Sequence, residues 1–570
     1  MRKYSFYLSS LFLIIFSFFP LLAFANNTPV ILQALEEELD RSREGLTLDV
    51  FGSPYFLSYL VKDTQKAKIQ ATYGAILKSS ADRSRNLYIE AKVGDMHSDS
   101  SNADLESVRP PLLITLPIED DLDALKKNIW LATDREYKTA VLKYLRKKGK
   151  NIQKVEIDNI DDFSMGEKNV HIEAVREYDN FSDRMPSWKN IIRKTSAAFK
   201  LNKEIINSRV DFSANSVIRY YLNSEGSKIV NQKDIFSITL SARTKSKDGM
   251  NLFDQDVMYF QDPENFPTEE VLREKVLALT QSMMEIRESE VMEPYVGPAI
   301  LAPDAAGVLF HEAIGHRLEG ERQRSEQEGK TFRDKIDESI LPDFISIYDD
   351  PSRKEYNNIK LSGHYRYDEE GQIGQKVVLV ENGVLKNFLL SRTPIKNFPK
   401  TNGHGRSDGL KDPMARMSNL IVKSDREVSL ETLKDMLIEE ARKQNKPYGL
   451  LIKKVVGGET NTSKYNFQVF KGKPVFIYKV YVDDGRLELM RGAEFVGTPL
   501  ASINKIKATG NDYQVFNGFC GAESGFVPVS NITSSVLLSE IELQRTSTRK
   551  TKPPILSRPA FSSVLPEMEF

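Results

Sequence analysis

The first half of the chain alternates between segments with helical and with strand-like hydrophobic spacing. Apolar residues recur at helical intervals over residues 30–43, 120–148, 188–199 and 267–287. Short or alternating apolar runs between these segments predict strands, which cover residues 55–62, 67–77, 85–93, 208–212, 217–222, 236–242 and 257–260. Alternation is typical of a sheet that turns one face toward water. The pattern therefore predicts a mixed α/β N-terminal domain.

The second half is dominated by predicted strands. Two hairpins are clear, over residues 377–390 and 475–489. Each turns at a dipeptide, Asn382-Gly383 or Asp484-Gly485, that readily adopts the positive φ angles of a two-residue hairpin turn. We expect this half to be a β-rich domain, built either as a curved sheet or as a barrel-like structure.

Glycine and proline interrupt the hydrophobic periodicity between Glu293 and Asp304, which marks a domain boundary. One helix is expected among the later strands, over residues 429–444, besides the helix that carries the motif described below. The expected fold class is α+β, in which the parts are a signal peptide at 1–25, an N-terminal domain at 26–295, a C-terminal domain at 296–545 and an extended tail at 546–570.

The first 25 residues resemble a secretory signal peptide. Arg2 and Lys3 precede an apolar stretch over residues 8–22, and Ala23-Phe24-Ala25 supplies a small-x-small cleavage site. An uncleaved membrane anchor is the alternative, because the apolar stretch approaches the length that spans a bilayer. Pro20 and the cleavage site favour removal after Ala25. We therefore expect a secreted or periplasmic protein with no membrane anchor after cleavage.

The composition matches a globular protein rather than a disordered tail, a collagen or a polytopic membrane protein. Of the 570 residues, 40% are hydrophobic and 28% are charged. The 79 basic residues are balanced by 80 acidic ones, so the chain has no global basic field. Nucleic acid is therefore not an expected partner.

The chain contains a single cysteine, Cys520, so no intramolecular disulfide can form. An isolated thiol is exposed to oxidation in a secreted protein. Ligation of a metal ion would protect it.

The most informative stretch is His311-Glu312-Ala313-Ile314-Gly315-His316. It follows an apolar segment that reads as a helix capped by Asp304. The two histidines are five positions apart, which separates them by about 140° on a regular α-helix. To meet at one ion, they need either a π-type widening of one turn or an opening of the helix at Gly315. Two unrelated histidines on a surface helix remain the alternative.

Cys520 supplies a third candidate ligand, in a glycine-flanked turn before the apolar run at residues 526–529. Two imidazoles and a thiolate suit zinc and leave a fourth position open for water, as in catalytic zinc sites. Glu312, next to the first histidine, is placed to act as a general base. The pattern predicts hydrolysis of a carbonyl compound, most simply a peptide bond.

These residues resemble the TldD/PmbA family of zinc metallopeptidases, and specifically its metal-binding TldD-like branch. The resemblance covers most of the second half and rests on residues 304–320, 367–371, 381–383, 402–406, 416–419, 520–521 and 527–530. It implies that His311, His316 and Cys520 bind Zn²⁺ and that Glu312 is the catalytic base. It also implies an α/β first domain, a curved β-rich second domain, a dimer, and unfolded peptides that bind as an added strand.

The sequence departs from the family pattern after Cys520-Gly521, where Ala522, Glu523 and Ser524 replace the usual lysine and glutamine. The rim of the site and the substrate preference are therefore expected to differ. Many family members work with a partner that lacks the metal motif, but a secreted chain need not meet one. A homodimer is expected instead.

Two other functions are compatible with the same residues. The chain could be a secreted peptide-binding protein in which the metal is purely structural. Alternatively, Cys520 could be the nucleophile of a cysteine hydrolase with a histidine as its base, although papain-like local signatures are missing around it. His364 and His404 are expected to be ordinary loop residues, and Arg406 either holds a substrate carboxylate or forms a salt bridge across its loop.

Overall fold

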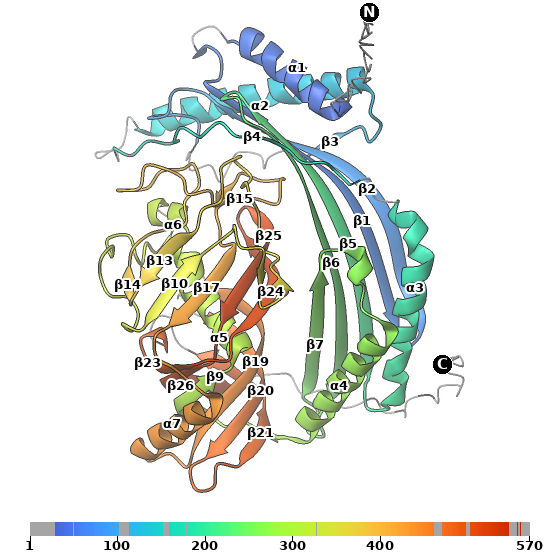
Figure 1. Ribbon diagram of the computed structural model, residues 1–570, viewed down its shortest axis with the longest axis vertical. Helices are drawn as coiled ribbons and strands as arrows, with labels where there is room; N and C mark the ends of the chain where they lie inside the picture. The colour runs from blue at the N-terminus through green and yellow to red at the C-terminus, as the bar shows by residue number, and fades with distance from the viewer. Residues whose placement is uncertain are drawn as a thin grey trace, which may run out of the picture.

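The computed structural model describes residues 29–48, 51–101, 113–151, 159–176, 180–325, 328–460, 470–496 and 502–546, with the single positions 554, 556 and 559. The predicted signal peptide and most of the predicted tail lie outside these residues. Two bodies stand side by side in Figure 1, an arched sheet with its helices and a β-rich C-terminal body. Among the described residues, no helix is long and apolar enough to cross a membrane.

A seven-stranded sheet forms the N-terminal body, in the order β3-β2-β1-β5-β6-β4 with β7 also paired to β6. Its strands are β1 (Phe56–Thr72), β2 (Ala75–Lys92), β3 (Ile114–Leu116), β4 (Val170–Ile172), β5 (Asn207–Asn223), β6 (Lys228–Lys245) and β7 (Asn251–Phe260). The long strands are antiparallel and curve together (Figure 1). The predicted mixed α/β domain is confirmed, although some strand limits are wrong.

Each strand predicted in this domain is only part of a longer one or has other limits, and two of these differences have a clear cause. The strand expected over residues 67–77 ends at Thr72, because Tyr73 and Gly74 adopt φ angles of 45° and 84° and form the turn into β2. The two strands expected at 208–212 and 217–222 are one strand, β5. Polar residues interrupted the hydrophobic signal within β5, but they alternate in phase with it and occupy the sheet's other face.

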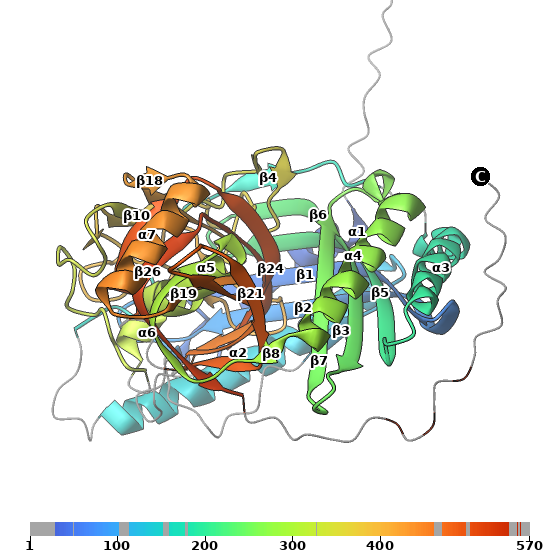
Figure 2. The same cartoon turned by 90° about the horizontal axis from the view of Figure 1, so that it is seen from below.

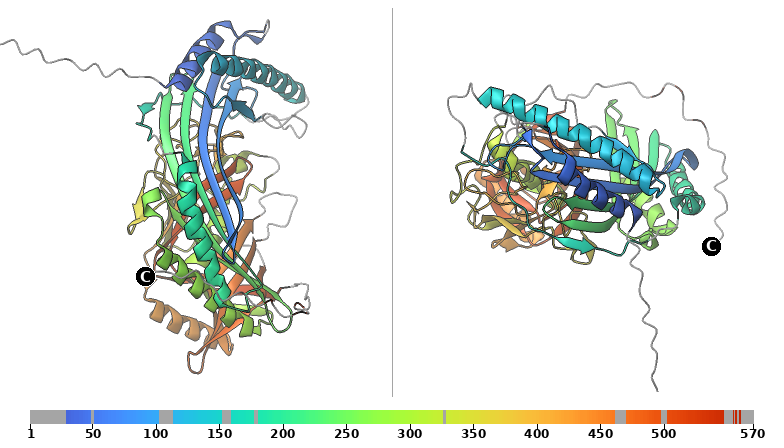
Figure 3. Two further views of the ribbon diagram at one scale, coloured as in Figure 1. Left: turned by 90° about the vertical axis from the view of Figure 1, so that its right-hand side faces the viewer. Right: turned by 90° about the horizontal axis from the view of Figure 1, so that it is seen from above.

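Four helices cover one face of this sheet, α1 (Val30–Gly45), α2 (Leu122–Asn151), α3 (Phe181–Ala197) and α4 (Glu269–Glu288). The first two pack on one end, where Tyr59 and Val61 are buried. The other two pack on the opposite end, against Ile69, Val210 and Phe212. Figure 3 shows α3 lying along the strands on this outer face. Short 3₁₀ turns follow α3 and precede α4, at Ala198–Leu201 and Pro263–Asn265.

The C-terminal body contains two larger sheets. The six-stranded sheet has the order β14-β13-β10-β17-β25-β24, with strands β10 (Ile345–Asp349), β13 (Val377–Glu381), β14 (Val384–Leu385), β17 (Asn419–Ser424), β24 (Gln514–Ala522) and β25 (Gly525–Thr533). The nine-stranded sheet has the order β18-β23-β26-β9-β19-β20-β21-β8, with β22 paired to β26. In the described part of the chain both sheets are open, so the curved-sheet alternative holds and the barrel does not.

The nine-stranded sheet comprises β8 (Glu290–Val291), β9 (Tyr295–Leu301), β18 (Glu427–Val428), β19 (Tyr448–Thr460), β20 (Phe470–Tyr481), β21 (Leu487–Arg491), β22 (Ala493–Val496), β23 (Ile506–Gly510) and β26 (Val536–Arg545). Two small ribbons complete the body, β11 (Glu355–Tyr356) with β12 (Ile359–Lys360), and β15 (Gly405–Arg406) with β16 (Met414–Ala415). Both predicted hairpins are confirmed, since Val380 pairs with Leu385 and Val480 pairs with Leu487.

Helix α5 (Pro303–Phe310) lies between the two sheets of this body (Figure 1). It continues into a π turn at His311–Gly315, a 3₁₀ turn at His316–Leu318 and the short helix α6 (Gly320–Arg324). On the other face of the nine-stranded sheet lies α7 (Leu430–Lys443), which packs Leu433 and Leu437 against Leu451. Helix α7 confirms the helix expected over residues 429–444.

The two bodies meet on the face of the N-terminal sheet that carries no helices (Figure 2). Arg219 on β5 donates hydrogen bonds to the carbonyl oxygens of Tyr367 and Asp368, at 3.0 and 2.7 Å. Lys233 on β6 donates to the carbonyl oxygens of Ser362 and His364, at 2.7 and 2.9 Å. These contacts attach the C-terminal body to one end of the arch and leave the other end of the same face uncovered by them.

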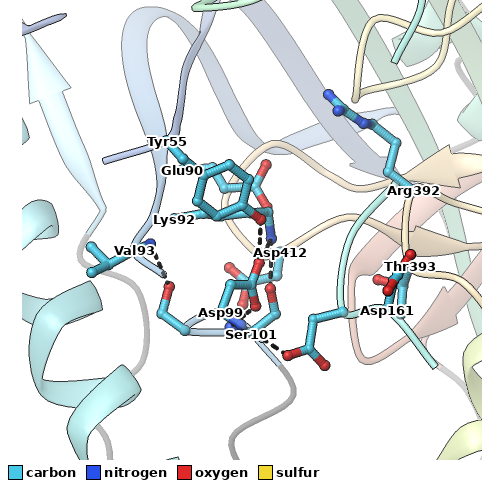
Figure 4. A network of polar contacts seen from close by, with 12 residues as sticks. Tyr55, Glu90, Lys92, Val93, Asp99, Ser101, Asp161, Arg392, Thr393 and Asp412 are labelled. Carbon is cyan, nitrogen blue, oxygen red and sulfur yellow. Dashed lines mark hydrogen bonds and ion pairs between the residues drawn. The ribbon is translucent and has the colours of Figure 1, made fainter. Parts of the chain in front are cut away.

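A polar network fastens the segment after β2 to the end of that strand (Figure 4). Lys92 contacts Glu90 at 2.9 Å and donates to Ser101 Oγ at 2.7 Å. Tyr55 donates to the Asp99 carboxylate at 2.6 Å. At the same end of β2, Tyr88 donates to the Asp412 carboxylate of the C-terminal body at 2.8 Å, which holds the two bodies together there.

Candidate metal centre

Helix α5 places the candidate site between the two sheets of the C-terminal body. Ala302 is its N-cap and Pro303 occupies its first turn, as proline prefers. The prediction that Asp304 caps the helix is therefore wrong. Asp304 lies inside the first turn, where its carboxylate accepts a hydrogen bond from the Val455 amide of β19 at 3.3 Å.

The five-residue spacing of the two histidines is absorbed by the π turn at His311–Gly315. Of the two local distortions considered from the sequence, widening of the turn is the one that occurs. The imidazole ring centres of His311 and His316 lie 5.0 Å apart with perpendicular planes. Both rings are buried, which contradicts the alternative of two unrelated surface histidines.

Gly315 is required by close packing rather than by its backbone angles. A Cβ atom placed there would lie 2.0 Å from the sulfur of Met417. Its φ angle of −51° is ordinary for a helix. The glycine therefore allows the widened turn to press against the segment before β17.

Cys520 completes the cluster from β24, in the six-stranded sheet. Its Sγ atom lies 3.1 Å from His311 Nε2 and 3.4 Å from His316 Nε2. The residue is part of a strand and pairs with Val527, so the expected glycine-flanked turn is wrong. The hairpin turn comes just after Ala522, because Gly525 and not Gly521 adopts the left-handed φ angle, at 92°.

The three side chains fit a zinc ion by donor type and spacing. Their ligand atoms all lie within 4.8 Å of one another. Tetrahedral zinc with its usual bond lengths keeps a sulfur and a nitrogen ligand about 3.6 Å apart. The observed separations are close to that value, and the cluster offers three ligands, as catalytic zinc sites do.

Neighbouring side chains orient both imidazoles through their other nitrogen. His316 Nδ1 contacts Glu319 Oε1 at 3.1 Å, and His311 Nδ1 contacts Asn531 Oδ1 at 3.4 Å. Glu319 is held in turn by Arg322 at 2.7 Å and by Arg416 at 3.3 Å. Acceptors placed on the far nitrogen fix the ring orientation of metal-binding histidines and raise their basicity.

These orienting residues were not predicted. Glu319 lies three positions after His316, so helical spacing could have indicated it. Asn531 and Arg416 come from distant segments, and only the fold brings them to the site.

The protein's own side chains shift the pKa values of all three candidate ligands. Burial raises the pKa of the Cys520 thiol, but the two imidazoles outweigh it and hold that pKa well below its ordinary value. Burial lowers the pKa of His311 and His316, yet the neighbouring sulfur outweighs it and raises both. A thiolate is therefore the favoured form of Cys520, which is the form that binds metals.

Glu312 lies in the π turn beside His311, and its side chain is buried. A Cβ atom placed on Gly458 of β19 would lie 3.0 Å from Glu312 Oε1, so a residue without a side chain faces the carboxylate. Among the described residues, no side chain or amide donates a hydrogen bond to this carboxylate. The arrangement leaves Glu312 able to accept a proton beside the cluster.

The other candidates from the sequence have structural contacts. His364 Nδ1 contacts the Pro351 carbonyl oxygen at 2.8 Å. His404 is fully buried between Asp349 at 3.2 Å and Asn402 at 3.0 Å. Arg406 is buried and donates to the Pro528 carbonyl oxygen at 2.9 Å, so it contacts backbone rather than a carboxylate.

Comparison with known proteins supports the family resemblance of the C-terminal domain. Residues 295–545 match the PmbA/TldA metallopeptidase C-terminal domain. A metalloprotease of Methanocaldococcus jannaschii is 32% identical over 234 residues, which are 41% of this chain and 47% of that protein. A zinc metalloprotease TldD homolog of Saccharolobus solfataricus is 28% identical over 238 residues, 41% of this chain and 48% of that protein. The chain thus spans about half the length of the curated relatives it matches.

Solved structures show the same fold over most of the chain. TldE from Thermococcus kodakarensis has a TM-score of 0.58 at 15% identity and covers 90% of this chain and 100% of its own. A Thermotoga maritima protein reaches a TM-score of 0.60 at 17% identity, with 89% and 99% covered. The sequence resemblance is confirmed for the C-terminal domain, residues 295–545, which match the metallopeptidase C-terminal domain of the PmbA/TldA type.

Proposed function

We propose that this chain is a zinc-dependent peptidase. The observation that carries the proposal is the π turn, which brings the Nε2 atoms of His311 and His316 to the sulfur of Cys520. The names of the relatives, metalloprotease and zinc metalloprotease, support the same class. Peptide hydrolysis, zinc as the metal and the role of Glu312 are the specific parts of the proposal.

His311, His316 and Cys520 would hold the ion, and Glu319 and Asn531 would keep the imidazoles turned toward it. When bound, zinc would supply a Lewis acid that polarises a carbonyl group and acidifies water. Glu312 accepts a proton on its carboxylate and returns it to the leaving amine. Gly458 faces this carboxylate and has no side chain that could compete for the proton.

We further propose that the protein acts outside the cytoplasm, as a homodimer, on unfolded peptides that bind as an added strand. The signal-like first 25 residues support the compartment. Strand addition would let main-chain hydrogen bonds carry recognition and give broad sequence tolerance. Light scattering at micromolar concentration tests the dimer, and an active monomer would contradict it.

Metal content measured together with peptide turnover tests the central proposal. The chain purified from residue 26 should contain about one zinc ion, lose turnover of an unstructured peptide with a chelator, and regain it with zinc. A metal-free sample with full activity contradicts it. Binding of peptides without any cleavage would favour the peptide-binding protein, and a covalent adduct on Cys520 would favour the cysteine hydrolase.

A further inference from the structure

The helix-free face of the N-terminal sheet carries charged and hydroxyl side chains where its other face carries the hydrophobic core. On β5, Val210 and Phe212 are buried under the helices, whereas Arg209 and Asp211 point to the opposite side. The register aligns this polar set across the strands, with Asn207 opposite Arg243 and Arg209 opposite Ser241. Alternation therefore creates a continuous polar surface on the side of the C-terminal body.

A cavity of about 410 Å³ lies on this surface at the end away from Arg219 and Lys233. Its lining residues come from three adjacent strands and are Asn207, Arg209, Asp211, Thr239, Ser241, Arg243, Phe253 and Gln255. Arg243 lies against the ring of Phe253, 4.8 Å from its centre, and Gln70 holds Asp211 at 2.7 Å. Hydrogen-bonding groups and one aromatic ring thus surround two guanidinium groups.

Neither guanidinium in this cavity is neutralised by an ion pair with a described residue. Arg209 and Arg243 are both exposed. Next to the cavity on the same face, Lys66 and Lys68 of β1 are also exposed. Asp211 also lines the cavity, but Gln70 donates to its carboxylate and the two guanidinium groups outnumber it, so the cavity keeps an excess of positive charge. Such an excess attracts anionic groups and concentrates them there.

Strand β7 connects this cavity with the metal centre. Near its middle, the carbonyl oxygen of Gln255 and the carboxylate of Asp254 accept hydrogen bonds from Lys454 of β19. At its far end, Tyr259 packs against Phe519 of β24, with ring centres 6.2 Å apart. Phe519 directly precedes Cys520, and β19 also carries Gly458 beside Glu312. The strand therefore passes both elements that flank the metal ligands.

We propose that this cavity, with Arg209 and Arg243, binds an acidic group of an extended peptide whose scissile bond lies at the metal centre. The inference rests on the proposed peptidase function and adds a substrate class to it, peptides with acidic residues. From Phe253 to Tyr259 the strand spans about 20 Å, and the Tyr259–Phe519 contact lengthens the path to the metal centre further, so the acidic group lies at least about six residues from the cleaved bond. The two guanidinium groups bind its carboxylate, and the lysines on β1 attract the remaining negative charge.

Binding of two matched peptides tests the inference. The probes are a fluorescein-labelled, twelve-residue, glycine- and serine-rich peptide with four glutamates, and the same peptide with glutamines. Fluorescence anisotropy with the Glu312→Gln protein, which prevents cleavage, should show about tenfold tighter binding of the glutamate peptide. Arg209→Gln with Arg243→Gln should abolish that difference and leave binding of the glutamine peptide unchanged.

The matched control is Arg193→Gln with Arg273→Gln, two exposed arginines on the helices α3 and α4 that cover the other face. Equal affinity for the two peptides, or an equal loss in the control, overturns the inference. An oligothymidine of the same charge is the second control. If it binds as tightly as the glutamate peptide and loses affinity equally in the cavity variants, the inference is overturned, because the surface would then be a general polyanion site.

Turnover of the glutamine peptide by the otherwise unaltered protein reports on the peptidase proposal separately. If that peptide is cleaved and charge has no effect on binding, the peptidase stands and the substrate class fails. If neither peptide is cleaved while binding discriminates as expected, the cavity stands and the peptidase proposal fails.

Discussion

Two sites in the C-terminal body contain buried histidines, and they differ in the atoms that the imidazole nitrogens contact. His404 contacts fixed oxygen atoms with both nitrogens, from Asn402 and Asp349. In the metal centre, each Nδ1 faces an oxygen while each Nε2 faces the sulfur of Cys520. An imidazole whose two nitrogens both contact oxygen atoms holds loops together. Imidazoles whose Nε2 atoms share a sulfur neighbour can instead bind a metal ion. Burial alone does not separate the two kinds.

The largest effect should come from Cys520→Ser, which removes the sulfur that distinguishes the two sites. A hydroxyl is a much poorer zinc ligand than a thiolate, so zinc content and peptide turnover should fall together, turnover by about three decades. Metal analysis and turnover on one sample check this. If the variant keeps its zinc, the sulfur is not a ligand and the comparison is wrong.

Glu312→Gln should separate catalysis from metal binding. The amide preserves the size of the side chain but cannot accept the proton, so turnover should fall by at least about two decades. Zinc content and peptide affinity should stay as they are, which calorimetry and metal analysis can measure. Turnover at the unaltered rate would remove Glu312 from the mechanism.

Glu319→Gln should show how much the orienting oxygens contribute. Loss of the carboxylate beside His316 Nδ1 should lower zinc affinity by about ten- to a hundredfold, without removing a ligand. Titration against a competing chelator measures the affinity. Glu338→Gln is a control, because this exposed carboxylate pairs only with Lys335 among the described residues, at 2.5 Å. An affinity loss of equal size in the control would refute the assigned role.

His404→Ala should have the smallest effect on function. It leaves Asp349 without one of its partners and opens a small cavity, so the free energy of unfolding should fall by about 2–4 kcal/mol. Urea unfolding measures this, and zinc content with turnover at 25 °C should remain unchanged. A loss of zinc without a loss of stability would place His404 in the metal centre.

Hydrophobic spacing predicted the helices and both C-terminal hairpins because one face of each of these elements packs against a hydrophobic core. It failed where polar residues continue a strand, as in β1 and β5, since their outer faces meet water and the other body. The motif predicted His311, His316 and Cys520 as a group, because unusual spacing and a lone cysteine are visible in the sequence. Asn531 and Arg416 were missed because their positions depend on the tertiary structure.

The three candidate ligands belong to different mechanical parts of the C-terminal body. Both histidines follow α5, which continues directly from β9 of the nine-stranded sheet, whereas Cys520 lies on an edge strand of the six-stranded sheet. An ion held by all three would connect the two sheets. Removing it should free the β24–β25 hairpin to separate from the helix, and faster amide hydrogen exchange should appear there before it appears in β9.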